Sequence, residues 1–268
     1  MGKLWTFGDS FTYGSGLHGF MPEDIFWYGQ SFSEYIFPKL VANHLDLVLE
    51  NHGMPGENNL AIIREILKFV PEITPQDVVI IGLTCPARYP VFTGKDTTFT
   101  ISGDVLYKIV EALKSGKETP IWAGVLIDTY SIDELQIILD YYLTVMPRFF
   151  DQAYLQHLES IQSIQKLFLN RGIKCLIWDR TTWESFENIE TWTRGLGDRQ
   201  VYDGHWSPNG NLKFAEIVKR SLLDLSVDNP ILITDKYIEF EIEKDPKIFD
   251  HLRYIEPHIP VNSSNNLI

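Results

Sequence analysis

Short apolar runs alternate along the chain with longer segments whose apolar residues recur at helical spacing. The short runs predict buried strands at residues 3–7, 47–49, 77–81 and 174–178. The longer segments predict amphipathic helices at residues 33–45, 60–70, 131–145, 148–169 and 208–223. This order is typical of parallel strands covered by helices on both faces. We therefore predict an α/β fold, a three-layer α/β/α sandwich around a parallel sheet of about four or five strands.

Two regions do not follow the alternation. Residues 89–147 predict an insertion or lid region, in which residues 97–100 form either a small hairpin or an extended loop. Residues 224–268 are acidic and contain four prolines. We interpret them as a C-terminal extension that wraps on the core or contacts a partner, such as a second copy of the chain. The sandwich itself is expected to occupy residues 1–223.

Composition excludes several classes of protein. The 268 residues are 44% hydrophobic, which is too apolar for a disordered chain, and the net charge of −13 disfavours nucleic acid and anionic membranes as partners. Cys85 and Cys175 are too few for a disulfide framework or a Cys-rich zinc site, and their apolar neighbours predict buried thiols. No metal or cofactor is expected. The lack of a secretory signal or a long apolar run predicts a cytoplasmic protein.

A serine follows the first predicted strand, in the sequence Phe-Gly-Asp-Ser-Phe-Thr-Tyr-Gly of residues 7–14. Ser10 is thus expected at the carboxyl edge of the parallel sheet, where α/β proteins bind their ligands. A plainer interpretation is that Asp9 and Ser10 cap a following helix, since Gly, Asp and Ser are common in turns.

A nucleophilic serine needs a base, because its hydroxyl is barely ionised at neutral pH. Among the seven histidines, His205 stands just before the last long helix, two residues after Asp203. That carboxylate can orient the imidazole and stabilise its charged form, which predicts a Ser-His-Asp arrangement across one sheet edge. The alternative is a solvent-exposed loop histidine beside a helix cap. His18 and His52 are further candidates near the site.

Three blocks together resemble the SGNH/GDSL hydrolase superfamily. Residues 8–11, Gly-Asp-Ser-Phe, resemble its GDSL signature, with Phe in place of Leu. Residues 51–56, Asn-His-Gly-Met-Pro-Gly, are similar to its second block, and residues 203–205, Asp-Gly-His, to its last block. The resemblance covers residues 3 to about 223. It implies a flavodoxin-like fold and a serine esterase that works through an acyl-enzyme, with the N–H groups of Ser10 and Gly53 binding the oxyanion.

The sequence departs from the family at the third block, where Thr84 stands in place of the usual asparagine. A threonine hydroxyl can donate one hydrogen bond, so Thr84 is a candidate third oxyanion donor. Arg88 is a nearby source of positive charge, and we expect it to bind substrate together with Asp9 and Trp206. The spacing Asp-x-His is shorter than the commoner Asp-x-x-His.

The expected substrate is an ester of a small acyl group, such as acetyl, on a carbohydrate. This expectation rests on the superfamily and on aromatic residues in predicted loops, which can stack on sugars or simply pack. Residues 181–198 are a candidate lid. Two other functions stay open: a catalytically weakened scaffold that binds glycan or assembles with partners, for instance in a virus particle, and an O-acyltransferase that passes the acyl group to a sugar.

Overall fold

The fold was obtained as a computed structural model of the 268-residue chain. The structure describes residues 1–14, 33–84, 88–92, 98–119, 123–145, 150–179, 206–226 and 228–253.

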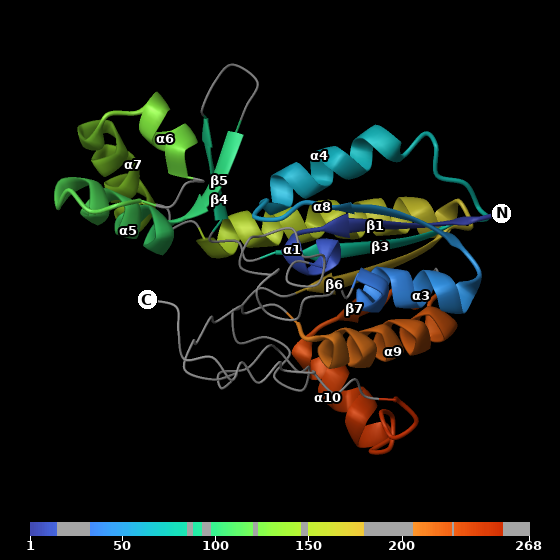
Figure 1. The fold of residues 1–268 in the computed structure, drawn as a ribbon. Helices are drawn as coiled ribbons and strands as arrows, with labels where there is room; N and C mark the ends of the chain where they lie inside the picture. The colour runs from blue at the N-terminus through green and yellow to red at the C-terminus, as the bar shows by residue number, and fades with distance from the viewer. Residues whose placement is uncertain are drawn as a thin grey trace, which may run out of the picture.

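The centre of the molecule is a five-stranded sheet in the order β2-β1-β3-β6-β7 (Figure 1). The strands are β1 (Lys3–Gly8), β2 (Val48–Gly53), β3 (Val78–Leu83), β6 (Lys174–Asp179) and β7 (Leu232–Ile233). Every neighbouring pair is parallel. All strands therefore end at the same edge of the sheet.

Helices cover both faces of this sheet (Figure 1). One face carries α4 (Asn59–Phe69) and α8 (Phe150–Asn170). The other carries α3 (Phe37–Leu45) and α9 (Pro208–Asp224), with α10 (Asp235–Lys244) beyond α9. The short 3-10 helix η1 (Ser33–Tyr35) precedes α3. The predicted three-layer α/β/α sandwich is confirmed.

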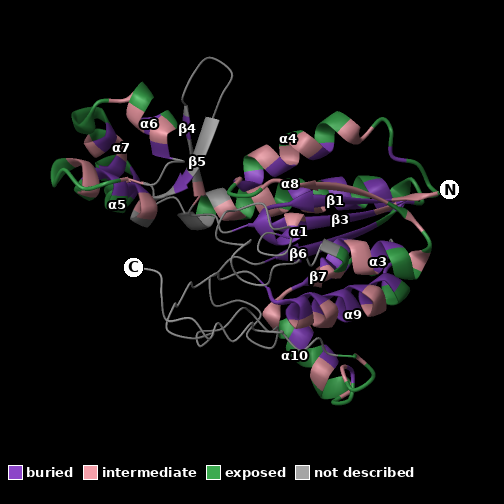
Figure 2. Ribbon diagram, viewed as in Figure 1, coloured by how far each residue is buried: buried purple, intermediate pink, exposed green. Residues whose placement is uncertain are grey.

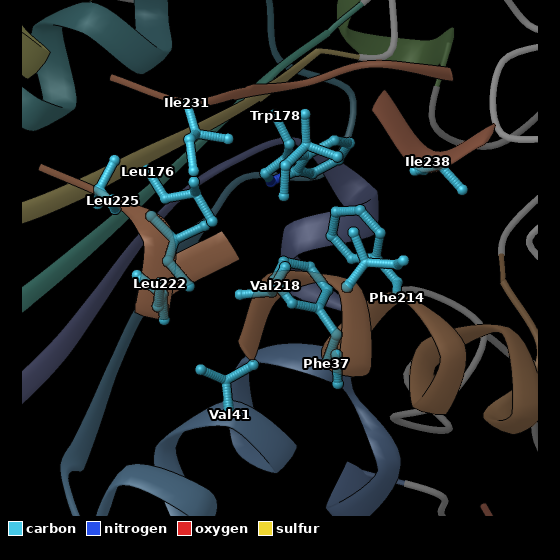
Figure 3. Packing of buried hydrophobic residues seen from close by; sticks show 14 of the residues in the cluster. Phe37, Val41, Leu176, Trp178, Phe214, Val218, Leu222, Leu225, Ile231 and Ile238 are labelled. Atoms are coloured by element: carbon cyan, nitrogen blue, oxygen red, sulfur yellow. The ribbon is translucent and has the colours of Figure 1, made fainter. Parts of the chain in front are cut away.

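Alternation of side chains along the strands builds a separate core on each face. In β1, Trp5 and Phe7 pack with Ile62 of α4 and Phe168 of α8, whereas Leu4 points into the other core. That second core joins the sheet to α3 and α9, and Figure 3 shows its packed side chains. Strands β1, β3 and β6 are buried along most of their length, while the edge strand β2 is only partly covered (Figure 2).

The sandwich does not stop at residue 223. Strand β7 pairs with β6, and four isoleucines from this part of the chain are buried in the core beside α9: Ile231, Ile233, Ile238 and Ile248. The segment predicted to be an extension therefore adds the edge strand β7 to the sheet. It belongs to the sandwich at least as far as residue 253. A strand of two residues has no periodicity that sequence analysis could detect.

Residues 88–145 form a unit with its own apolar core beyond the carboxyl edge of the sheet (Figure 1). The hairpin alternative is confirmed, because β4 (Arg88–Phe92) and β5 (Thr98–Ser102) are antiparallel. Helices α5 (Gly103–Lys114), α6 (Gly124–Thr129) and α7 (Ile132–Thr144) follow. Ser131 caps α7 and forms a capping box with Glu134. We refer to β4, β5, α5, α6 and α7 as the inserted unit.

Candidate functional site

The site begins where β1 ends, at the carboxyl edge of the sheet. Asp9 caps the short helix α1 (Ser10–Tyr13), and its Oδ1 accepts a hydrogen bond of 3.0 Å from the Phe11 N–H. The capping interpretation is thus correct for Asp9. Ser10 is the first helical residue and is 4% exposed. Ser10 therefore lies at the edge where α/β folds bind ligands.

Gly53 lies against the backbone of α1. A Cβ atom at Gly53 would stand 2.3 Å from the nitrogen and 2.6 Å from the Cα of Tyr13. Only glycine allows β2 and α1 to approach this closely. Asn51, on the same strand, holds the same end of the helix, because its Nδ2 donates to the Thr12 carbonyl at 3.1 Å. The second block therefore positions α1, a role that the sequence analysis did not assign to it.

The Gly53 amide has a partner within β2. It donates to Asn51 Oδ1 at 3.0 Å, and the Thr6 hydroxyl donates to the same oxygen at 3.0 Å. An amide carries one proton. Gly53 can therefore act as the expected oxyanion donor only by releasing Asn51.

Asp9, Thr84 and Arg88 converge on one another. The Thr84 hydroxyl donates to Asp9 Oδ2 at 2.8 Å, and Arg88 Nη1 donates to the same oxygen at 3.1 Å. In this arrangement the single hydroxyl proton of Thr84 is donated to Asp9. The expectation that Thr84 donates to an oxyanion is therefore not met. Asp9 and Arg88, expected to bind substrate, here form a largely buried ion pair with side chains 6% and 12% exposed.

Asn59 holds the loop after β3, a role that the sequence analysis missed. Its Oδ1 accepts from the Thr84 N–H at 2.8 Å, and its Nδ2 donates to the Thr84 carbonyl at 3.0 Å. The neighbouring Asn58 caps α4 by accepting from the Ala61 N–H at 3.0 Å. Two successive asparagines at a helix start are the available signal, since only one of them can be the cap.

Trp206 is a core residue. Only 2% of it is exposed, and its ring packs against Phe214 at 4.5 Å and Phe11 at 5.0 Å between centroids. A substrate cannot stack on a face that is covered in this way, so the prediction that Trp206 binds substrate is wrong. The next residue, Ser207, caps α9 by accepting from the Gly210 N–H at 3.0 Å.

The proposed base and acid, His205 and Asp203, lie outside the described residues, as do His18 and the candidate lid at residues 181–198. Their roles stay predictions. Within the described part of the chain, no hydrogen bond joins the Ser10 side chain to another residue. The described residues therefore place Ser10, but not the acid and base of the predicted arrangement.

His52 belongs to the layer beneath α4. Its ring stacks on Trp5 and Phe7, with centroids 5.6 and 5.2 Å apart, and its Nδ1 is 3.6 Å from Glu65 Oε1. Trp5 and Phe7 point away from the core that contains Phe11 and Trp206. His52 is therefore a packed residue of the α4 face and not the base for Ser10.

A second buried carboxyl group, Asp179, stands at the end of β6, level with Leu83 at the end of β3. The Tyr154 hydroxyl of α8 donates to Asp179 Oδ2. Asp179 Oδ1 has no hydrogen-bond partner among the described residues. Burial raises the pKa of Asp179 to about 6, and the negative charge of Asp235 adds to this, while the Tyr154 hydrogen bond acts in the opposite direction. Burial and the same contact raise the pKa of Tyr154.

Sequence analysis did not single out Asp179. The available signal is an aspartate that ends the apolar run Cys-Leu-Ile-Trp-Asp of residues 175–179.

Other chemistry has little support in the described residues. Cys175 is a buried free thiol, as predicted, and burial raises its pKa, which makes it unreactive; Cys85 lies outside the described part. No group of three metal-ligating side chains occurs in that part, and none of its helices is long and apolar enough to cross a membrane. No family model matches the chain, and no curated protein matches it.

Proposed function

We propose that the protein is a serine-dependent ester hydrolase of the SGNH/GDSL kind. The observation that carries the proposal is the contact between Phe11 and Trp206, whose ring centroids are 5.0 Å apart. Phe11 follows Ser10, and Trp206 follows His205. Consecutive Cα atoms are about 3.8 Å apart, so this contact supports a base within reach of the nucleophile. It joins segments that are far apart in the sequence.

The reaction would proceed in two steps. Ser10 Oγ attacks the ester carbonyl while its proton passes to His205, and His205 then protonates the alcohol oxygen as the C–O bond breaks. Water next attacks the acyl-enzyme, gives a proton to His205, and releases the acid as Ser10 recovers its proton. Asp203 would orient the imidazole and stabilise its charged form throughout.

Stabilisation of the oxyanion would be the weak part of this enzyme. The Ser10 N–H is the proposed donor, while the Gly53 N–H is bonded to Asn51 and the Thr84 hydroxyl to Asp9. Loss of one donor typically slows such chemistry by about 10²–10³. We therefore expect a slow hydrolase, faster only if substrate draws the Gly53 amide away from Asn51.

The proposed substrate is an ester of a small acyl group, such as acetyl, on a carbohydrate. This part rests on the resemblance of residues 8–11 and 51–56 to the superfamily, since Trp206 offers no stacking surface. Transfer of the acyl group to a sugar would use the same residues, with a sugar hydroxyl in place of water in the second step.

One observation favours a second function, a scaffold without catalysis that binds glycan or assembles with partners. Two of the three expected oxyanion donors, the Gly53 N–H and the Thr84 hydroxyl, are engaged in hydrogen bonds with other side chains. A protein that had lost hydrolysis could keep these bonds as purely structural contacts.

Hydrolysis of p-nitrophenyl acetate separates the two functions. The wild type should release p-nitrophenol, and Ser10→Ala and His205→Ala should each lose that activity. Ser163→Ala is a matched control, because Ser163 is on the outer part of α8, where its hydroxyl bonds only to the Glu159 carbonyl among the described residues. Equal rates in the wild type and Ser10→Ala would rule out the hydrolase and leave the scaffold.

A further inference from the structure

Arg88 connects three parts of the molecule. It is the first residue of β4 and thus of the inserted unit, yet its Nη1 reaches Asp9 Oδ2 at 3.1 Å and the Glu57 carbonyl at 3.3 Å. Asp9 immediately precedes Ser10, and Glu57 lies just before α4. One guanidinium therefore joins the inserted unit, the entrance to α4 and the start of α1.

The contact between Arg88 and Asp9 is largely shielded from water, which makes it costly to break. The two side chains are 12% and 6% exposed, so little water would replace a lost partner. Removing one member of a buried pair leaves the other charge uncompensated. The pair therefore holds the inserted unit against α1 more firmly than a surface ion pair could.

Asp9 passes this restraint to the nucleophile. Its Oδ1 accepts from the Phe11 N–H, and its Oδ2 accepts from Thr84 and Arg88. Ser10 lies between the capping residue and the Phe11 amide that the cap binds. A shift of the Asp9 carboxylate must therefore move the first turn of α1, on which Ser10 is carried.

We propose that Arg88 is a positioning residue that acts on Ser10 through Asp9 and thereby couples the inserted unit to the nucleophile. Its catalytic consequence rests on the proposed function, whereas its effect on α1 does not. A positioning residue lowers kcat and the reactivity of Ser10. A residue that binds substrate with equal strength throughout the reaction would instead raise KM.

The test compares Arg88→Met, Arg88→Lys, Asp9→Asn and the double variant Asp9→Asn/Arg88→Met. Arg171→Met is the matched control, because Arg171 binds the main-chain carbonyls of Val70 and Ile73 at the far end of α8. One readout is the rate at which a fluorophosphonate labels Ser10, together with kcat and KM for p-nitrophenyl acetate. The other is amide hydrogen exchange in α1, where the Tyr13 and Gly14 N–H groups bond to the Asp9 and Ser10 carbonyls.

Arg88→Met should slow labelling and lower kcat by about 10²-fold with KM nearly unchanged, as expected for a misplaced nucleophile. It should also speed exchange of the α1 amides by about tenfold. Arg88→Lys keeps the charge and should recover part of both effects, and Arg171→Met should show neither. In the Asp9→Asn variant, the further substitution of Arg88 should change labelling, kcat and exchange only slightly. The ion pair through which Arg88 acts on Ser10 is already absent there.

The outcomes separate this inference from the proposed function. If the wild type neither hydrolyses ester nor labels at Ser10, the hydrolase is ruled out, and exchange in α1 alone decides the link to Arg88. Unchanged exchange in Arg88→Met and Arg88→Lys would overturn the inference. So would full additivity of the two substitutions, or a rise in KM at constant kcat.

Discussion

Asp9 and Asp179 are both buried aspartates at the carboxyl edge of one sheet, but their surroundings differ. Asp9 accepts hydrogen bonds from a backbone amide, a hydroxyl and a guanidinium. Asp179 accepts one, from Tyr154, and its other oxygen has no partner among the described residues. The positive Arg88 lies beside Asp9, whereas the negative charge of Asp235 acts on Asp179.

This difference shows how the surroundings of a buried carboxyl group determine whether it is compensated for the loss of water. An adjacent cation and several donors compensate the carboxylate at Asp9 for the loss of water. At Asp179, burial raises the pKa by more than the hydrogen bond from Tyr154 lowers it, and the pKa of the group is about 6. Sequence position alone would have suggested similar behaviour, since Asp179 ends a buried strand and Asp9 directly follows one.

The largest expected effect is on stability after removal of the compensated carboxylate. Asp9→Ala removes the carboxylate beside the largely covered Arg88 guanidinium and the cap of α1, and should lower the free energy of unfolding by about 3–5 kcal/mol. Urea denaturation followed by circular dichroism measures it. Asp228→Ala, at an exposed aspartate, should stay within about 0.5 kcal/mol of the wild type. A loss as small as that of the control would show that the Asp9–Arg88 pair contributes nothing.

Asp179→Asn should have an effect that depends on pH. With a pKa raised from 3.8 to about 6, the native state holds its proton more tightly than the unfolded state. The wild type therefore loses stability as pH rises from about 4 to 6, by about 3 kcal/mol in full. Asparagine cannot ionise, so the variant lacks this loss and should be more stable than the wild type at pH 8.

The difference in unfolding free energy between Asp179→Asn and the wild type, measured with urea at pH 4 and pH 8, isolates this effect. Other groups titrate in both proteins and largely cancel. The same difference at both pH values would contradict a raised pKa at Asp179.

Gly53→Ala tests the other restraint on α1. A Cβ atom at this position would meet the Tyr13 backbone at 2.3 Å, so the helix must shift, at an expected cost of about 1–3 kcal/mol. Labelling of Ser10 should slow as well. The control Gly124→Ala has open space around the added atom and should be neutral or slightly stabilising in urea denaturation. Equal stability of both variants would mean that α1 and β2 are not held this closely.

Thr84→Val should have the smallest effect and decides the role of that hydroxyl. As a partner of Asp9, it should contribute about 1–2 kcal/mol of stability, while kcat falls by less than about tenfold. Were it an oxyanion donor instead, kcat would fall by about 10²–10³ with stability little changed. Urea denaturation and ester hydrolysis of the one variant distinguish these results.

Most of the sandwich could be predicted from the sequence, because buried parallel strands and amphipathic helices leave clear patterns. The exceptions have physical reasons. Strand β2 continues from residue 50 to Gly53 through polar residues that pair with β1, although they look like a turn. Strand β7 is too short for a pattern, and α5 lies in the inserted unit, outside the alternation of strands and helices that predicts the sandwich.

The site was harder to predict because its contacts are long-range. The position of Ser10 after β1 can be predicted from the local sequence, and the cap at Asp9 is one of the two interpretations that this sequence allows. The pairing of Asp9 with Arg88 joins residues separated by 79 positions, and no local pattern encodes it. The burial of Trp206 is hard to predict for a related reason, since the local sequence of a tryptophan before a helix is the same whether it faces solvent or packs on Phe11.

Covalent labelling of the nucleophile is the most direct test of the central claim. Wild-type protein would be treated with a fluorophosphonate, digested and analysed by mass spectrometry, beside His205→Ala. We predict a phosphonyl adduct on Ser10 in the wild type and its loss when the imidazole is removed. An unmodified Ser10 in the wild type, or equal labelling of Ser10 in both proteins, would contradict the claim that this serine is activated by His205.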